Sequence, residues 1–95
     1  MITLNSKLYL MPIKQKLYSI PIKGESVNFL LTQLQDEKYE AYSDHQSFIK
    51  LFPSGKLSGK EIEDLYADTT LDASRKEIIN SLEFAYLEFQ LYCRP

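Results

Sequence analysis

The chain has 95 residues, of which 44% are hydrophobic and 25% are charged, and its formal net charge is −2 at pH 7. This size and composition predict one small globular domain over residues 1–95, and no apolar run approaches the length that spans a membrane. One cysteine and one histidine exclude an internal disulfide framework and a zinc site of the usual four-ligand kind. We therefore expect a cytoplasmic protein that holds no metal or cofactor.

Residues 1–23 predict a β-hairpin that turns around Lys14. Alternate side chains of a strand point to opposite faces, and in this register the apolar residues gather on one face. In the hairpin Leu8 would face Ile20, and Leu10 would face Tyr18. The apolar face would hold Ile2, Leu4, Leu8, Leu10, Tyr18, Ile20 and Ile22.

The segments Lys7–Lys14 and Lys16–Lys23 are identical at six of eight positions. Their offset of nine residues is odd, so in a hairpin the two copies would lie on opposite faces and could not have equivalent roles. We interpret the similarity as a consequence of strand-forming composition. The alternative is a pair of short docking motifs, because both copies contain Tyr-x-x-Pro.

Helical patterns follow Gly24 and predict an acidic, mainly helical part over residues 24–95. Val27, Leu30, Leu31 and Leu34 have the spacing of one buried helix face, which predicts a first helix from Ser26. Asp44 is a candidate cap for a short second helix that ends before Pro53. Capping boxes at Ser58–Glu61 and at Ser74–Glu77 predict a third helix and a longer last one. The expected fold is therefore α+β, with an N-terminal β-hairpin packed against three to four helices.

The last predicted helix carries two apolar stripes. The first contains Ile78, Leu82, Ala85, Tyr86, Phe89 and Tyr92, and the second contains Phe84, Leu87 and Leu91. Such a helix is either packed between two layers, which we favour in so small a domain, or lends its second stripe to a partner. Residues 84–93 also alternate between apolar and polar side chains, so a third strand is the alternative to a helix there.

Few residues of the chain suit catalysis, and the sequence predicts that the protein is not an enzyme. A nucleophile–base pair would have to join Cys93 with His45, the one cysteine and the one histidine of the chain. The glycines and lysines from Gly55 to Lys60 do not have the spacing of a phosphate-binding loop.

Charge is distributed unevenly and suggests two classes of binding protein. The leading interpretation is a protein–protein interaction module that binds another protein or a second copy of itself, of the kind found among small bacterial or phage-encoded inhibitors and regulators. Its candidate contacts are Phe84, Leu87 and Leu91 with the acids Glu61, Asp64 and Asp68.

The alternative is a small nucleic-acid-binding or anion-binding protein. Residues 1–23 hold four lysines and no acidic residue, and Tyr9 could stack on a base. The candidate residues are Lys7, Tyr9, Lys14, Lys16 and Lys23. The acidic balance of the remaining chain disfavours this interpretation, because nucleic-acid binders neutralise phosphates with a basic surface.

Overall fold

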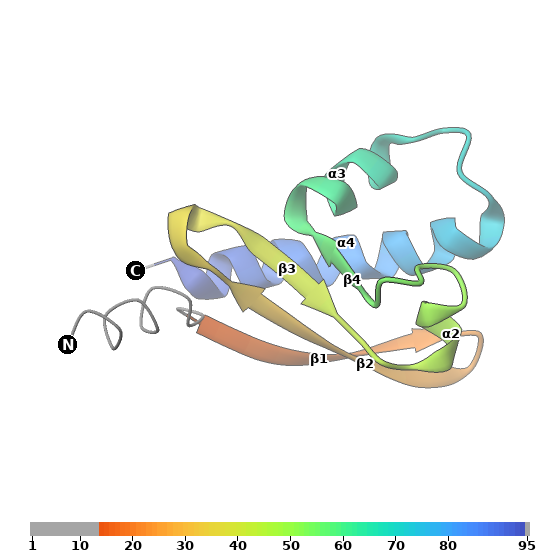
Figure 1. The fold of residues 1–95 in the computed structure, drawn as a ribbon, viewed down its shortest axis with the longest axis horizontal. Coiled ribbons are helices and arrows are strands. Elements are labelled where there is room, and N and C mark those ends of the chain that lie inside the picture. The colour runs from red at the N-terminus through yellow and green to blue at the C-terminus, as the bar shows by residue number, and fades with distance from the viewer. Residues whose placement is uncertain (1–13, 95) are drawn as a thin grey trace.

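A computed structural model describes residues 14–94 and shows an α+β domain (Figure 1). Four antiparallel strands form one sheet in the order β1-β2-β3-β4. The strands are β1 (Lys14–Ile22), β2 (Glu25–Gln33), β3 (Tyr39–Tyr42) and β4 (Lys56–Ser58); the helices are η1 (Gln35–Glu37), α2 (Gln46–Ile49), α3 (Gly59–Ala67) and α4 (Ala73–Cys93). The predicted class, with an N-terminal hairpin and the longest helix at the C-terminal end, is confirmed.

The hairpin lies further along the chain than the sequence pattern indicated. Its two strands are β1 and β2, and its turn consists of Lys23 and Gly24, between the paired residues Ile22 and Glu25. Both turn residues have positive φ, at 50° and 81°, as two-residue hairpin loops of this kind require. The predicted pairs of Leu8 with Ile20 and of Leu10 with Tyr18 involve residues outside the described part of the chain.

The helix predicted from Ser26 is wrong, because this segment is strand β2. Val27, Phe29 and Leu31 alternate along β2 and are buried, with relative exposures of 0%, 0% and 1%. Leu30 points to the other face of the sheet, so the apparent helical spacing combined residues from two faces. Pairing on both sides, with β1 and with β3, fixes the segment as a strand.

The later helices form where the sequence predicted them, with two different caps. Ser58 and Glu61 form the predicted capping box at the start of α3. His45, rather than Asp44, caps α2 by accepting a hydrogen bond from the Ser47 amide. Asp72, rather than Ser74, caps α4. Residues 84–93 are helical, so the alternative of a third strand in this segment is wrong.

The core lies between one face of the sheet and one face of α4, and Phe48 of α2, Phe52 after it and Ile62 of α3 complete it. Its sheet residues are Ile20, Ile22, Val27, Phe29, Leu31, Ala41 and Leu57, and its α4 residues are Ile78, Ile79, Leu82, Ala85, Tyr86, Phe89 and Cys93. Edge-to-face aromatic contacts join the sheet to α4. The rings of Tyr18 and Tyr39 both pack edge-on against Phe89, with centroid distances of 6.3 and 6.0 Å. The elements that cover α4 therefore lie on one side of it.

Tyr18 introduces one polar atom into this core. Its hydroxyl is buried and makes no hydrogen bond of ordinary geometry among the described residues, although the Glu88 carboxylate lies near it. Burial, and then the neighbouring Glu88 carboxylate, raise the pKa of Tyr18 to about 12. An unfolded tyrosine ionises near pH 10, so between about pH 10 and 12 the unfolded state loses this proton before the folded state does. Rising pH in this window therefore favours unfolding.

We expect Tyr18→Phe to raise the free energy of unfolding by roughly 1 kcal/mol at neutral pH, because it removes a buried hydroxyl that makes no well-formed hydrogen bond. Its advantage over the wild type should increase as the pH rises through the alkaline window. Urea unfolding at a series of pH values measures both effects. A destabilised variant, or one whose alkaline loss of stability equals that of the wild type, would contradict this interpretation of Tyr18.

Candidate functional site

The outward face of α4 is the most conspicuous surface feature of the domain. Phe84, Leu87 and Leu91, here called the outer stripe, have relative exposures of 77%, 52% and 62%. They lie on the opposite side of the helix from Leu82 and Phe89, both at 0%. The favoured prediction that other elements enclose both stripes of this helix is therefore wrong. The sheet and α3 pack on the inner side and leave the second apolar line exposed.

Polar residues extend the outer stripe in both directions. Glu77 and Asn80 are exposed on α4, and Arg94 is exposed directly after its last residue, as the C-cap. With Phe84, Leu87 and Leu91 they form a series with successive spacings of three, four, three, four and three. This is the spacing of the a and d positions in a heptad repeat. The hydrophobic pattern alone does not identify Glu77, Asn80 and Arg94, although their spacing from the apolar residues could have done so. We call all six residues, Glu77, Asn80, Phe84, Leu87, Leu91 and Arg94, the α4 seam.

The start of α4 is fixed by its own side chains. The Asp72 carboxylate accepts hydrogen bonds from the Arg75 amide at 3.1 Å and from Arg75 Nη1 at 2.7 Å. These bonds lower the pKa of Asp72. Arg75 Nε also donates to the carbonyl of Leu51, 3.2 Å away. The N-terminal end of α4 is thus anchored to the rest of the domain, so the outer stripe sits on a rigid support.

The predicted acids of α3 are each engaged locally. Glu61 Oε1 accepts a hydrogen bond from the Ser58 amide at 2.9 Å, and Asp64 pairs with Lys60 on the same helix. Asp68 accepts hydrogen bonds from the amide and hydroxyl of Thr70, which lower its pKa. These carboxylates organise the ends and the outer face of α3, and α3 meets α4 through other residues, such as Glu63 with Tyr86.

Two of the lysines proposed for nucleic-acid binding lie against the end of α4. Lys14 Nζ is 3.3 Å from the carbonyl oxygen of Tyr92 and 5.3 Å from the centre of its ring. Lys16 Nζ forms an ion pair with Glu88 at 3.5 Å and lies over the ring of Tyr92. Both lysines therefore help to join β1 to α4. Lys23 is exposed in the hairpin turn, and Lys7 and Tyr9 lie outside the described residues.

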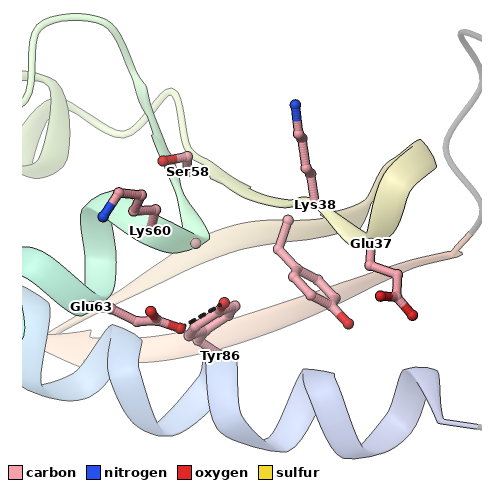
Figure 2. A pocket seen from close by; sticks show the side chains of 8 residues that line it. Glu37, Lys38, Ser58, Lys60, Glu63 and Tyr86 are labelled. Carbon is pink, nitrogen blue, oxygen red and sulfur yellow. Dashed lines mark hydrogen bonds between the residues drawn. The ribbon is translucent and has the colours of Figure 1, made fainter.

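A pocket of about 510 Å³ opens between α3, α4 and the start of β3 (Figure 2). Tyr86 donates a hydrogen bond from its hydroxyl to Glu63 Oε2 at 3.2 Å, and burial together with Glu63 raises the pKa of Tyr86. Burial and Glu63 also raise the pKa of Glu83. A tyrosine held in its neutral form is a hydrogen-bond donor and a poor base at neutral pH.

The two residues considered for nucleophilic chemistry have structural roles. His45 Nδ1 accepts the hydrogen bond that caps α2, and Cys93 is buried at the end of α4. Burial raises the pKa of the Cys93 thiol, which keeps it in its less reactive protonated form. Between residues 14 and 94, no cluster of three or more histidine, cysteine or acidic side chains could hold a metal ion.

A second exposed apolar row crosses the outer face of the sheet. Leu17 pairs with Leu30, and Leu30 pairs with Tyr42, so the three lie side by side across β1, β2 and β3. Leu17 and Tyr42 have relative exposures of 63% and 51%. The sequence patterns do not indicate this row, because the spacing of Leu30 with its apolar neighbours is that of a helix.

Comparisons with protein-family models, curated proteins and solved structures found no match to this chain. Among the helices of residues 14–94, none combines the length and the apolar character that crossing a membrane requires.

Proposed function

We propose that the protein is a non-catalytic protein–protein interaction module that binds its partner through the outer stripe of α4. One observation carries this proposal: Phe84, Leu87 and Leu91 are all more than half exposed on the helix whose opposite face forms the core. Contiguous exposed apolar side chains of this size are typical of binding surfaces in small proteins.

The rigidity of α4 supports the same function. The inner face of α4 is packed against the sheet, and its first turn is held by Asp72 and Arg75. A surface that is already ordered loses less conformational entropy on binding, so a small patch can still provide useful affinity. A small domain with such a surface can act as an inhibitor or regulator by covering a site on its partner.

The distribution of charge gives less support to nucleic-acid binding. Lys14 and Lys16 are engaged with Tyr92 and Glu88 of α4, which leaves them less free to contact phosphates. The acids of α3 do not carry the proposal either, because Glu61 and Asp68 serve as local hydrogen-bond acceptors.

Changing Leu87 and Leu91 together to glutamate tests the proposed function. Because both side chains are exposed, we expect the variant to fold with a free energy of unfolding within about 0.5 kcal/mol of the wild type. The charges should abolish association through the stripe. Urea unfolding measures stability, and sedimentation, together with affinity capture from a lysate of the source organism, measures association.

Leu17→Glu is the control, because it makes the same leucine-to-glutamate change once, on the exposed outer face of the sheet. This variant should fold and still associate. If Leu87→Glu/Leu91→Glu unfolds, the stripe belongs to the core; if it folds and associates normally, the partner binds elsewhere. Either result would contradict the proposal.

A further inference from the structure

We infer that the partner of α4 is a second copy of this chain, with the two α4 helices packed antiparallel around a two-fold axis between Phe84 and Leu87. This inference rests on the proposed function, since it assigns an occupant to the same stripe. The observation behind it is the order of residues along the α4 seam, all six of which are exposed.

The spacing of the seam is the same in both directions along the helix. The six residues follow one another at intervals of three, four, three, four and three. This series is the same when it is read from either end of the helix. An isologous interface requires such a match, because each residue must meet its counterpart under two-fold rotation. At 1.5 Å per residue the seam is about 25 Å long, and helices with this heptad spacing pack at a crossing angle of about 20°.

The antiparallel arrangement also brings apolar side chains of the two copies into contact. At the centre, Phe84 of one copy faces Leu87 of the other, so the two largest contacts are apolar. Further out, Leu91 faces the aliphatic part of Asn80, whose amide can reach solvent at the side of the seam.

Charge distinguishes the antiparallel arrangement from the parallel one. At each end of the antiparallel seam, Glu77 of one copy faces Arg94 of the other. A parallel pair would instead place Glu77 against Glu77 and Arg94 against Arg94. Glu77 Oε2 accepts a hydrogen bond from the Lys23 amide at 3.2 Å, and its second oxygen can receive the guanidinium. Opposite charges at the seam ends therefore select the antiparallel dimer.

Charge reversal at the two ends of the seam tests this arrangement by sedimentation equilibrium over a wide range of protein concentration. We expect the wild type to be in equilibrium between monomer and dimer. E77R and R94E should each raise the dimer Kd by about tenfold, because each turns two attractive contacts into repulsive ones. The double variant E77R/R94E should restore the Kd to within about threefold of the wild type.

The double variant separates contact between copies from effects within one chain. Glu77 lies near the start of α4 and Arg94 directly follows its last residue, about 25 Å away along the helix axis, so they cannot pair within a copy. E77R and the double variant both lose the hydrogen bond to the Lys23 amide, so recovery of the dimer cannot come from that bond. Asp64→Arg, an equal charge change on α3, should leave the Kd unchanged.

Two results would overturn the inference. One is a wild type that remains monomeric at every concentration, and the other is a double variant that dimerises no better than the single variants. If the wild type is monomeric and yet captures another protein through Leu87 and Leu91, the inference fails and the proposed function stands. If Leu87→Glu/Leu91→Glu also retains all binding, both fail.

Discussion

Replacing Phe89 with alanine should lower the free energy of unfolding by about 3–5 kcal/mol, a large part of the stability of a domain this small. Phe89 is fully buried, and its ring meets Tyr18 and Tyr39 edge-on and stacks on Tyr92. Alanine would leave a cavity between α4 and the sheet, and the rigid strands around it can close it only in part.

Phe84→Ala is the matched control, since it removes the same side chain from the opposite face of the same helix. Phe84 is 77% exposed, so its loss should change the free energy of unfolding by less than about 0.5 kcal/mol. Urea unfolding of both variants, followed by circular dichroism, measures the difference. If Phe84→Ala lowers the free energy of unfolding as much as we expect for Phe89→Ala, both faces of α4 are core, contrary to the structure.

Gly59→Ala should destabilise the protein by about 2–3 kcal/mol through overpacking. A Cβ atom at this position would lie 2.5 Å from the hydroxyl oxygen of Tyr86 and 2.9 Å from its Cζ atom. Tyr86 is buried and donates a hydrogen bond to Glu63, so it cannot move aside without losing contacts. The sign of the effect is diagnostic, because alanine in a helix is otherwise favoured over glycine by up to about 1 kcal/mol.

A double-mutant cycle with Tyr86→Phe assigns the effect to this contact. Phenylalanine lacks the hydroxyl that lies closest to the added Cβ. Gly59→Ala should therefore lower the free energy of unfolding by less in the Tyr86→Phe background than in the wild type. We expect a coupling of about 1 kcal/mol or more, measured by urea unfolding of the four proteins. Additive losses would mean that the hydroxyl is not the atom that crowds the added Cβ, and that the clash is with the ring carbons, which phenylalanine keeps.

The parts of the fold that the sequence predicted are those fixed by neighbouring residues. Ser58 and Glu61 satisfy each other's backbone amides within one turn, and the alternating burial of Ile20 and Ile22 follows from strand geometry. The sequence does not predict β2, because its apolar residues fit both the helical and the strand periodicity. Its partners β1 and β3 decide between them, and pairing between strands is not encoded locally.

The candidate site was only partly predictable for a related reason. A helical wheel places Phe84, Leu87 and Leu91 on one line, but whether that line is covered depends on the layers around the helix. The sheet forms a single layer on the inner side of α4, and this topology leaves the stripe exposed. Apolar spacing does not mark Glu77 and Arg94, because both side chains are charged.

The labelling rate of a cysteine at position 87 tests the central claim most directly, that α4 presents an exposed stripe which a second copy covers. In a Cys93→Ala background, Leu87→Cys should react with a thiol reagent as fast as an unstructured peptide at low protein concentration, and more slowly as the concentration rises. Leu17→Cys in the same background should react rapidly at every concentration. A cysteine at position 87 that is protected even in the most dilute sample would contradict the exposed stripe, and one that remains fully reactive in the most concentrated sample would contradict the pairing of two copies.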